Sequence, residues 1–320
     1  MLRTFKIIDQ KIVEITPETA TIFVYIHPDE TERQYLVNTY KLDEHTLAST
    51  LDPDELARLE FEPDHAAFIA KRPKNYSGKE QFLFRVSSFG VFLFKDKLIF
   101  VISEDYPVFD GKLFTKCGSV QDVVLKIIYQ TIFHYLDHLK IINMISEALE
   151  HKIKLSVDNT YLLNLFSLEK SLVYYVNAIH TNGVVLEKIK NSSSKIGFST
   201  EQLEILDDIL IENNQCFRQA EIYANVLNSL MEARASIVNN NLNNLIKQLT
   251  TISVMFMPLN LIAGMGGMSE FSAMTKGIPY WVSYGIFAVS MVVIGYLTFL
   301  IIAQKTGERP SKKKKDNKHL

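Results

Sequence analysis

The sequence is poor in cysteine, glycine and proline. Its 320 residues include only two cysteines, Cys117 and Cys216, together with 13 glycines and 9 prolines. Two cysteines cannot build a disulfide framework or a structural zinc site with several thiolates. So little glycine and proline also excludes collagen-like chains and most low-complexity chains. We expect both cysteines to be buried thiols in a reducing compartment.

Signals for secretion and for enzyme chemistry are also missing. The first residues contain no long apolar core before Asp9 and Lys11, so we do not expect a secretory signal peptide. No glycine-rich phosphate loop is visible, nor any Ser-His-Asp or Cys-His arrangement. The sequence therefore gives no reason to expect an enzyme.

Charge is distributed unevenly, although the formal net charge is only −2. Before Leu245 the chain has 33 acidic and 25 basic residues, or about −8. The last 76 residues have 3 acidic and 9 basic residues, or about +6. The near-neutral total thus conceals two regions with different properties.

Two long uncharged stretches lie near the C-terminus. Residues 248–269 contain no charge over 22 positions, and residues 277–304 contain none over 28. A helix needs about 20 predominantly apolar residues to cross a membrane. We therefore expect a transmembrane domain over 248–304, with spans at 248–269 and 277–304 and a short outer loop at 270–276. Trp281, the only tryptophan, begins the second span, where an aromatic interfacial anchor is typical.

Lysine and arginine placement predicts the orientation. The tail, residues 305–320, has seven basic residues, whereas the loop has only Lys276. The positive-inside rule then places both termini in the cytoplasm of an integral protein of the cell (inner) membrane. Beside a span, such a tail is expected to contact lipid headgroups rather than nucleic acid.

The region before the spans divides into two parts. Residues 1–117 predict a cytoplasmic α+β domain, and residues 118–247 predict a helical stalk. Asp158 is an expected N-cap, and Ser199 with Gln202 forms an expected capping box. The expected strands are 4–15, 21–25, 66–70, 81–86, 90–94 and 97–102, and the expected helices are 29–42, 43–51, 120–154, 158–190 and 199–264.

The last of these helices would be about 100 Å long. The α+β domain expected over residues 1–117 is too small to bury such a helix by itself. Two membrane spans in one chain also make a poor pathway for a solute. Assembly of several copies around an axis would solve both problems.

Residues 256–269 read Phe-Met-Pro-Leu-Asn-Leu-Ile-Ala-Gly-Met-Gly-Gly-Met-Ser. This stretch resembles the signature of the CorA-type divalent metal cation (magnesium) transporter family, and the layout of the whole chain is similar to that family. Two positions depart from the family pattern. Gly267-Met268-Ser269 stands where the family has Gly-Met-Asn, and Gly266 replaces an aromatic residue.

The resemblance implies a funnel-shaped homopentamer with an axial pore lined by the first span. It also implies Mg²⁺ influx down the electrochemical gradient, with intracellular Mg²⁺ at subunit interfaces closing the pore. Counting back from the motif, the acidic regulatory positions of the family fall on Asp208 and Glu232. The implied selectivity residues at the outer mouth are Gly267, Met268, Ser269 and Glu270.

A stripe on the first span suits this chemistry. Mg²⁺ prefers oxygen ligands and sheds water reluctantly, and neutral side-chain oxygens recur at spacings of 7, 3 and 7 residues. Apolar residues near the same face would form a dewetting constriction. Alternatively, these hydroxyls and amides bond neighbouring helices. The expected pore-lining residues are Asn243, Ile246, Leu249, Thr250, Ser253, Met257 and Asn260.

Two other functions remain open. The chain could transport Zn²⁺ or Co²⁺/Ni²⁺, although the absence of Cys and His from residues 253–304 favours hard cations. It could also be a non-conducting, membrane-anchored assembly that lost ion selectivity together with the asparagine.

Overall fold

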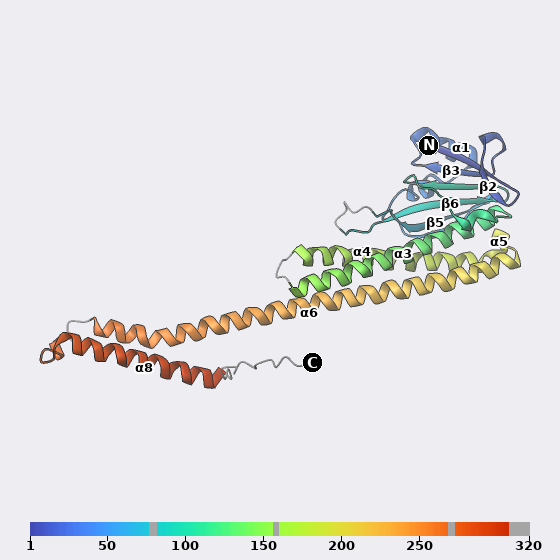
Figure 1. The fold of residues 1–320 in the computed structure, drawn as a ribbon. Helices are drawn as coiled ribbons and strands as arrows, with labels where there is room; N and C mark the ends of the chain where they lie inside the picture. The colour runs from blue at the N-terminus through green and yellow to red at the C-terminus, as the bar shows by residue number, and fades with distance from the viewer. Residues whose placement is uncertain (77–81, 156–159, 268–272, 307–320) are drawn as a thin grey trace. The chain divides into compact units, whose positions relative to one another are not determined.

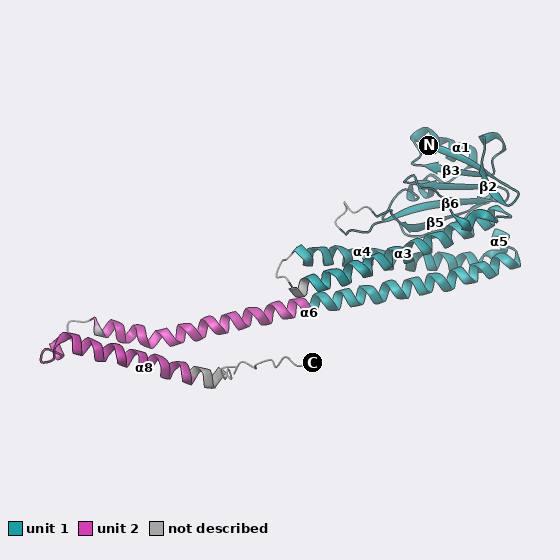
Figure 2. Cartoon of the chain, viewed as in Figure 1, with its two compact units in different colours: residues 1–232 teal, residues 233–320 magenta. Residues whose placement is uncertain are grey.

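The computed structural model describes residues 1–76, 82–155, 160–267 and 273–306. The chain forms two compact units, residues 1–232 and 233–320 (Figure 2). The long helix α6, Thr200–Gly266, contributes residues to both units.

The first unit (Figure 1) is built on a seven-stranded sheet in the order β2-β1-β3-β7-β6-β5-β4. Neighbouring strands are antiparallel except β3 and β7, which are parallel. The strands are β1 (Leu2–Ile8), β2 (Lys11–Glu14), β3 (Ile22–Ile26), β4 (Arg58–Phe61), β5 (His65–Pro73), β6 (Val86–Phe94) and β7 (Leu98–Ile102).

Both faces of the sheet are covered. On one face, α1 (Glu30–Tyr40) and α2 (Glu44–Ser49) pack Leu36 and Leu47 against the sheet. On the other face lie α3 (Val120–Leu155), α4 (Thr160–Asn191) and the first part of α6. Burial on two faces explains why β3 and β7 are apolar at every position. Short helical turns complete the unit: η1 (Pro17–Thr19), η3 (Lys112–Thr115) and α5 (Ser193–Ile196).

Two strand predictions were wrong, and one strand was not predicted. Residues 4–15 are not one strand, because Asp9 and Gln10 take positive φ angles of 49° and 61° and turn the chain into the β1–β2 hairpin. Residues 82–85 are not strand, and β6 begins only at Val86; Gln81 lies outside the described residues. The strand β4 was missed because its polar–apolar alternation, Arg-Leu-Glu-Phe, extends over only four residues.

Two of the long helices, α3 and α6, begin as the sequence predicts. The Ser199 hydroxyl accepts from the Gln202 N–H at 3.2 Å, and the Ser199 N–H donates to Gln202 Oε1 at 2.9 Å, so the capping box is confirmed. Gln202 also donates through Nε2 to Asp122 Oδ1 at 2.5 Å, which joins the first turns of α6 and α3. The expected cap Asp158 lies outside the described residues.

The second unit contains the rest of α6 together with α8 (Tyr280–Thr306). Both helices include a window long and apolar enough to cross a membrane, and neither window is buried within the chain. The two helices meet where Leu259 faces Gly295: a Cβ added to Gly295 would lie 3.3 Å from Leu259 Cδ1.

Candidate functional site

The expected pore-lining residues all lie on α6, and every one of them is exposed. Over residues 248–265, the partly buried residues of α6 are instead Thr251, Met255, Pro258, Leu259 and Ile262, on the side that meets α8. Successive residues of a helix turn by about 100°, so the two sets lie about half a turn apart. The structure thus turns the expected pore stripe away from α8.

The polar groups of this stripe have no partner within the described part of the chain. No side-chain hydrogen bond involves Thr250, Ser253 or Asn260 there, and the same is true of Asn243. Thr251, on the other side of the helix, instead donates its hydroxyl to the Lys247 carbonyl at 2.8 Å. The stripe therefore presents oxygen atoms that are free to contact water, an ion or another helix.

Only the first residue of the expected outer mouth is described. Gly267 follows the end of α6 and donates its N–H to the Ala263 carbonyl at 3.2 Å. The other three residues, Met268, Ser269 and Glu270, lie outside the described residues.

The expected regulatory carboxylates are both exposed on α6. Asp208 and Glu232 are 24 residues apart, which is about 36 Å along a helix, so they cannot share one ion. The neighbour of Asp208, Asp207, pairs with Lys190 at 2.7 Å. Within the described ranges no cluster of three or more His, Cys, Asp or Glu side chains could hold a metal.

Both cysteines are buried, as expected. Burial raises the pKa of the Cys117 thiol and, more strongly, that of Cys216, to about 12. Such thiols stay protonated and unreactive near neutral pH.

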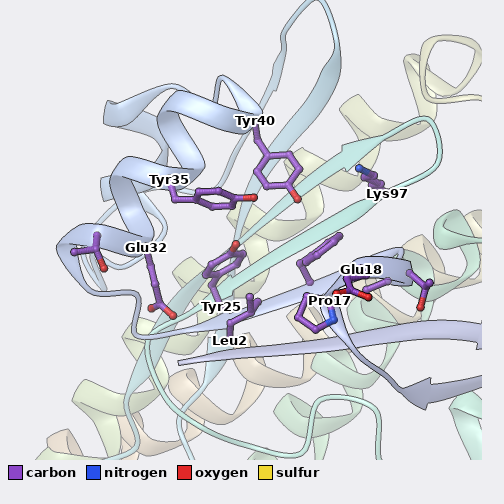
Figure 3. A pocket seen from close by; sticks show the side chains of 12 residues that line it. Leu2, Pro17, Glu18, Tyr25, Glu32, Tyr35, Tyr40 and Lys97 are labelled. Carbon is purple, nitrogen blue, oxygen red and sulfur yellow. The ribbon is translucent and has the colours of Figure 1, made fainter.

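Figure 3 shows a cavity of about 550 Å³ near α1, into which Tyr25, Tyr35 and Tyr40 project. Glu32 in its wall accepts from the N-terminal ammonium at 2.9 Å, and the Lys97 ammonium lies 5.8 Å from the Tyr40 ring centroid. Glu18 is a further charged group of the wall.

These features define a class of membrane protein: an α+β domain continuous, through one long helix, with the first of two C-terminal apolar helices. The chain belongs to the CorA-like Mg²⁺ transporter protein family, whose model matches residues 18–309. Its members are ion transporters rather than enzymes.

Individual relatives agree with this assignment. The cobalt/magnesium transport protein CorA of Methanocaldococcus jannaschii is 23% identical over 266 residues, which cover 77% of this chain and 80% of that protein. The complete structure of the CorA magnesium transporter from the same organism superposes with a TM-score of 0.76 at 20% identity, covering 94% of this chain and 96% of that one.

Two further structures share the fold at lower identity. The full-length CmaX protein has a TM-score of 0.71 at 12% identity, covering 94% of this chain and 96% of its own. The ZntB cytoplasmic domain from Vibrio parahaemolyticus has a TM-score of 0.56 at 13% identity, covering 74% and 98%. The predicted fold class, an α+β domain with long helices and two C-terminal spans, is thus confirmed, and the chain is a divalent cation transporter of this family.

Sequence reasoning missed one group of residues. Arg72 and His134 come together where β5 ends against α3, beside a second cavity. The available signal was the pair Lys71-Arg72 at the end of an otherwise apolar strand segment.

Proposed function

We propose that this chain forms a homopentameric channel that admits Mg²⁺ to the cytoplasm through a pore lined by α6. The observation that carries the proposal is the exposed stripe of neutral oxygens on the α6 face turned away from α8. An inward potential of ~100 mV supplies about 4.6 kcal/mol for a divalent ion, so no nucleotide chemistry is needed.

The two kinds of side chain in the stripe have separate roles. Thr250, Ser253 and Asn260, with Asn243, contact a hydrated ion, because Mg²⁺ retains much of its water. Ile246, Leu249 and Met257 form an apolar constriction that empties of water when the pore closes.

The outer mouth sets ion choice. Gly267, Met268 and Ser269 form the selectivity ring, and Glu270 adds a ring of negative charge that attracts cations. Both termini are cytoplasmic, and the basic tail contacts anionic lipid headgroups of the cell membrane.

Intracellular Mg²⁺ closes the channel at subunit interfaces. The ~36 Å separation of Asp208 and Glu232 requires two separate sites. No single copy supplies a metal cluster within its described residues, so a second copy must complete each site. An ion bridging two copies stabilises the closed arrangement over the open one.

The decisive experiment is ion flux into liposomes containing the purified protein, with Mg²⁺, Co²⁺, Ni²⁺ and Zn²⁺ tested in turn. We expect Mg²⁺ to cross fastest. Faster Zn²⁺ flux would favour a transporter of ZntB type, whereas no flux above empty liposomes would indicate a non-conducting assembly. Ser269→Asn should sharpen the preference for Mg²⁺, with Ser236→Asn, at an exposed position earlier on α6, as the control.

Regulation has its own test. Raising Mg²⁺ on the side that contacts the α+β domain should slow flux in the unaltered protein. Asp208→Asn and Glu232→Gln should each weaken this inhibition, whereas the exposed Glu201→Gln should not. Unchanged inhibition in both variants would exclude these two carboxylates as regulatory ligands.

A further inference from the structure

A polar cavity of about 310 Å³ lies between the end of β5 and the middle of α3. Its polar walls include Arg72 and Asn75 from the sheet side and Gln130, Thr131, His134 and Asp137 from α3. None of these residues belongs to the expected pore or to the expected regulatory sites.

Arg72 is the unusual member of this group. It pairs with Ser87 in the β5–β6 ladder and shares the helix-facing side of β5 with the core residues Phe68 and Ala70. The residue is only 4% exposed, and its guanidinium lies 3.4 Å from the centroid of the Tyr106 ring.

No carboxylate neutralises this guanidinium within the described residues. The only acid in the cavity wall, Asp137, accepts from Lys140 at 3.1 Å and keeps 65% of its side chain exposed. Buried charges are normally paired, because burial without a partner is costly. Among the described residues, the positive charge that faces this cavity therefore has no fixed counterion.

The neighbouring lysine shows the usual arrangement. Lys71 points to the opposite side of β5, where its ammonium donates to the Pro53 carbonyl at 2.5 Å. Burial lowers the pKa of this ammonium, although the charges of Asp54 and Asp52 act in the opposite direction. Of these two adjacent buried cations, only Arg72 lines the open cavity, and within the described residues it forms no ion pair with a carboxylate.

The rest of the wall adds mainly donors. Burial and the charge of Arg72 lower the pKa of His134 to about 4, although Asp137 acts in the opposite direction; the neutral ring keeps one N–H donor. The side-chain amides of Gln130 and Asn75 add further N–H groups, whereas the Thr131 hydroxyl is already donated to the Ile127 carbonyl at 2.9 Å.

We propose that this cavity binds a phosphate group, with Arg72 as its bidentate anchor and His134 as a second donor. Arginine presents its donors in a planar fork that matches phosphate oxygens. The cavity has room for roughly ten water molecules at ~30 Å³ each. It therefore accommodates inorganic phosphate or a small phosphate monoester.

The test is isothermal titration of the full-length protein in detergent with inorganic phosphate, and separately with glycerol phosphate, at constant ionic strength. We expect saturable binding that Arg72→Gln weakens by about 10- to 100-fold. Arg72→Lys should weaken it less, because lysine keeps the charge and loses only the fork. The exposed Arg218→Gln should bind as the unaltered protein does.

A second measurement keeps the proposal testable if Arg72→Gln does not fold. In nuclear magnetic resonance spectra, saturating phosphate should raise the pKa of His134 toward that of an ordinary histidine, and His134→Gln should weaken binding. Tighter binding of glycerol phosphate would identify a metabolite as the ligand, and equal binding would identify the free ion. No binding beyond that of chloride, or full binding by Arg72→Gln, would overturn the proposal.

Discussion

The side-chain amide of Asn182 pairs with both backbone polar groups of Lys71. The Lys71 N–H donates to Asn182 Oδ1 at 2.8 Å, and Asn182 Nδ2 donates to the Lys71 carbonyl at 2.7 Å. The strand β4 pairs with β5 only as far as Ile69, so this amide continues the hydrogen bonding where β4 ends. The contact ties α4 to the sheet and fixes the position of Arg72, the next residue.

Asn182→Ala should therefore destabilise the protein strongly. It would leave two buried backbone groups without partners, at a total cost of about 2–4 kcal/mol in the free energy of unfolding. The exposed Asn177→Ala, on the same helix, is the matched control and should change stability little. Thermal or denaturant unfolding of the full-length protein measures both, and equal stability of the two variants would contradict this role.

The close approach of α6 and α8 makes a second prediction. Gly295→Leu places a large side chain against Leu259, and overpacking of this kind costs about 1–3 kcal/mol. Gly285 has open space where a Cβ would be added, so Gly285→Leu should be tolerated. Thermal stability in detergent and ion flux should both fall for Gly295→Leu only. The same loss in both variants would show that helix proximity is not the cause.

The two histidines on α3 predict how stability depends on pH. Burial lowers the pKa of His134 and His138 to about 4, with further contributions from Arg72 on His134 and from His134 on His138, while Asp137 opposes both shifts. His138 also shares a 2.6 Å hydrogen bond with the Tyr175 hydroxyl.

Because both folded-state values lie below the ordinary 6.5, the unfolded chain takes up protons first as the pH falls. The contribution of these two histidines to the free energy of unfolding is therefore fully present above pH 6.5, and it is lost between pH 6.5 and about 4. Unfolding measured across this range should show the decline, and His134→Gln should reduce its slope by up to about one proton. The exposed His151→Gln should leave the slope unchanged, and a decline confined to lower pH would contradict the assignment.

The orientation of α6 can be tested with introduced cysteines. Ser253→Cys and Asn260→Cys lie on the proposed pore face, whereas Met255→Cys and Ile262→Cys lie on the side that meets α8. The native thiols Cys117 and Cys216 are buried, so they contribute little background.

A water-soluble, cationic thiol reagent should label the first pair faster and block their ion flux. The second pair should react slowly, because neighbouring side chains partly cover those positions. Faster labelling of the second pair would place the pore on the other side of the helix.

Local chemistry made much of the fold predictable. Ser199 and Gln202 specify a helix start through hydrogen bonds within four residues, and they form it. The hairpin at Asp9 and Gln10 was missed because neither residue is a glycine, although both take positive φ angles. The strand β4 was missed because its pairing with β5, rather than its own composition, makes it a strand.

The sequence by itself determined the class of protein. Two long uncharged stretches, a basic tail and the motif at residues 256–269 are local properties, and they need no knowledge of packing. The tertiary structure decided which face of α6 meets α8, and so which side chains stay exposed. It alone also joined Asn182 to Lys71 and left Arg72 without an acid among the described residues, because such contacts depend on residues far apart in the chain that only folding brings together.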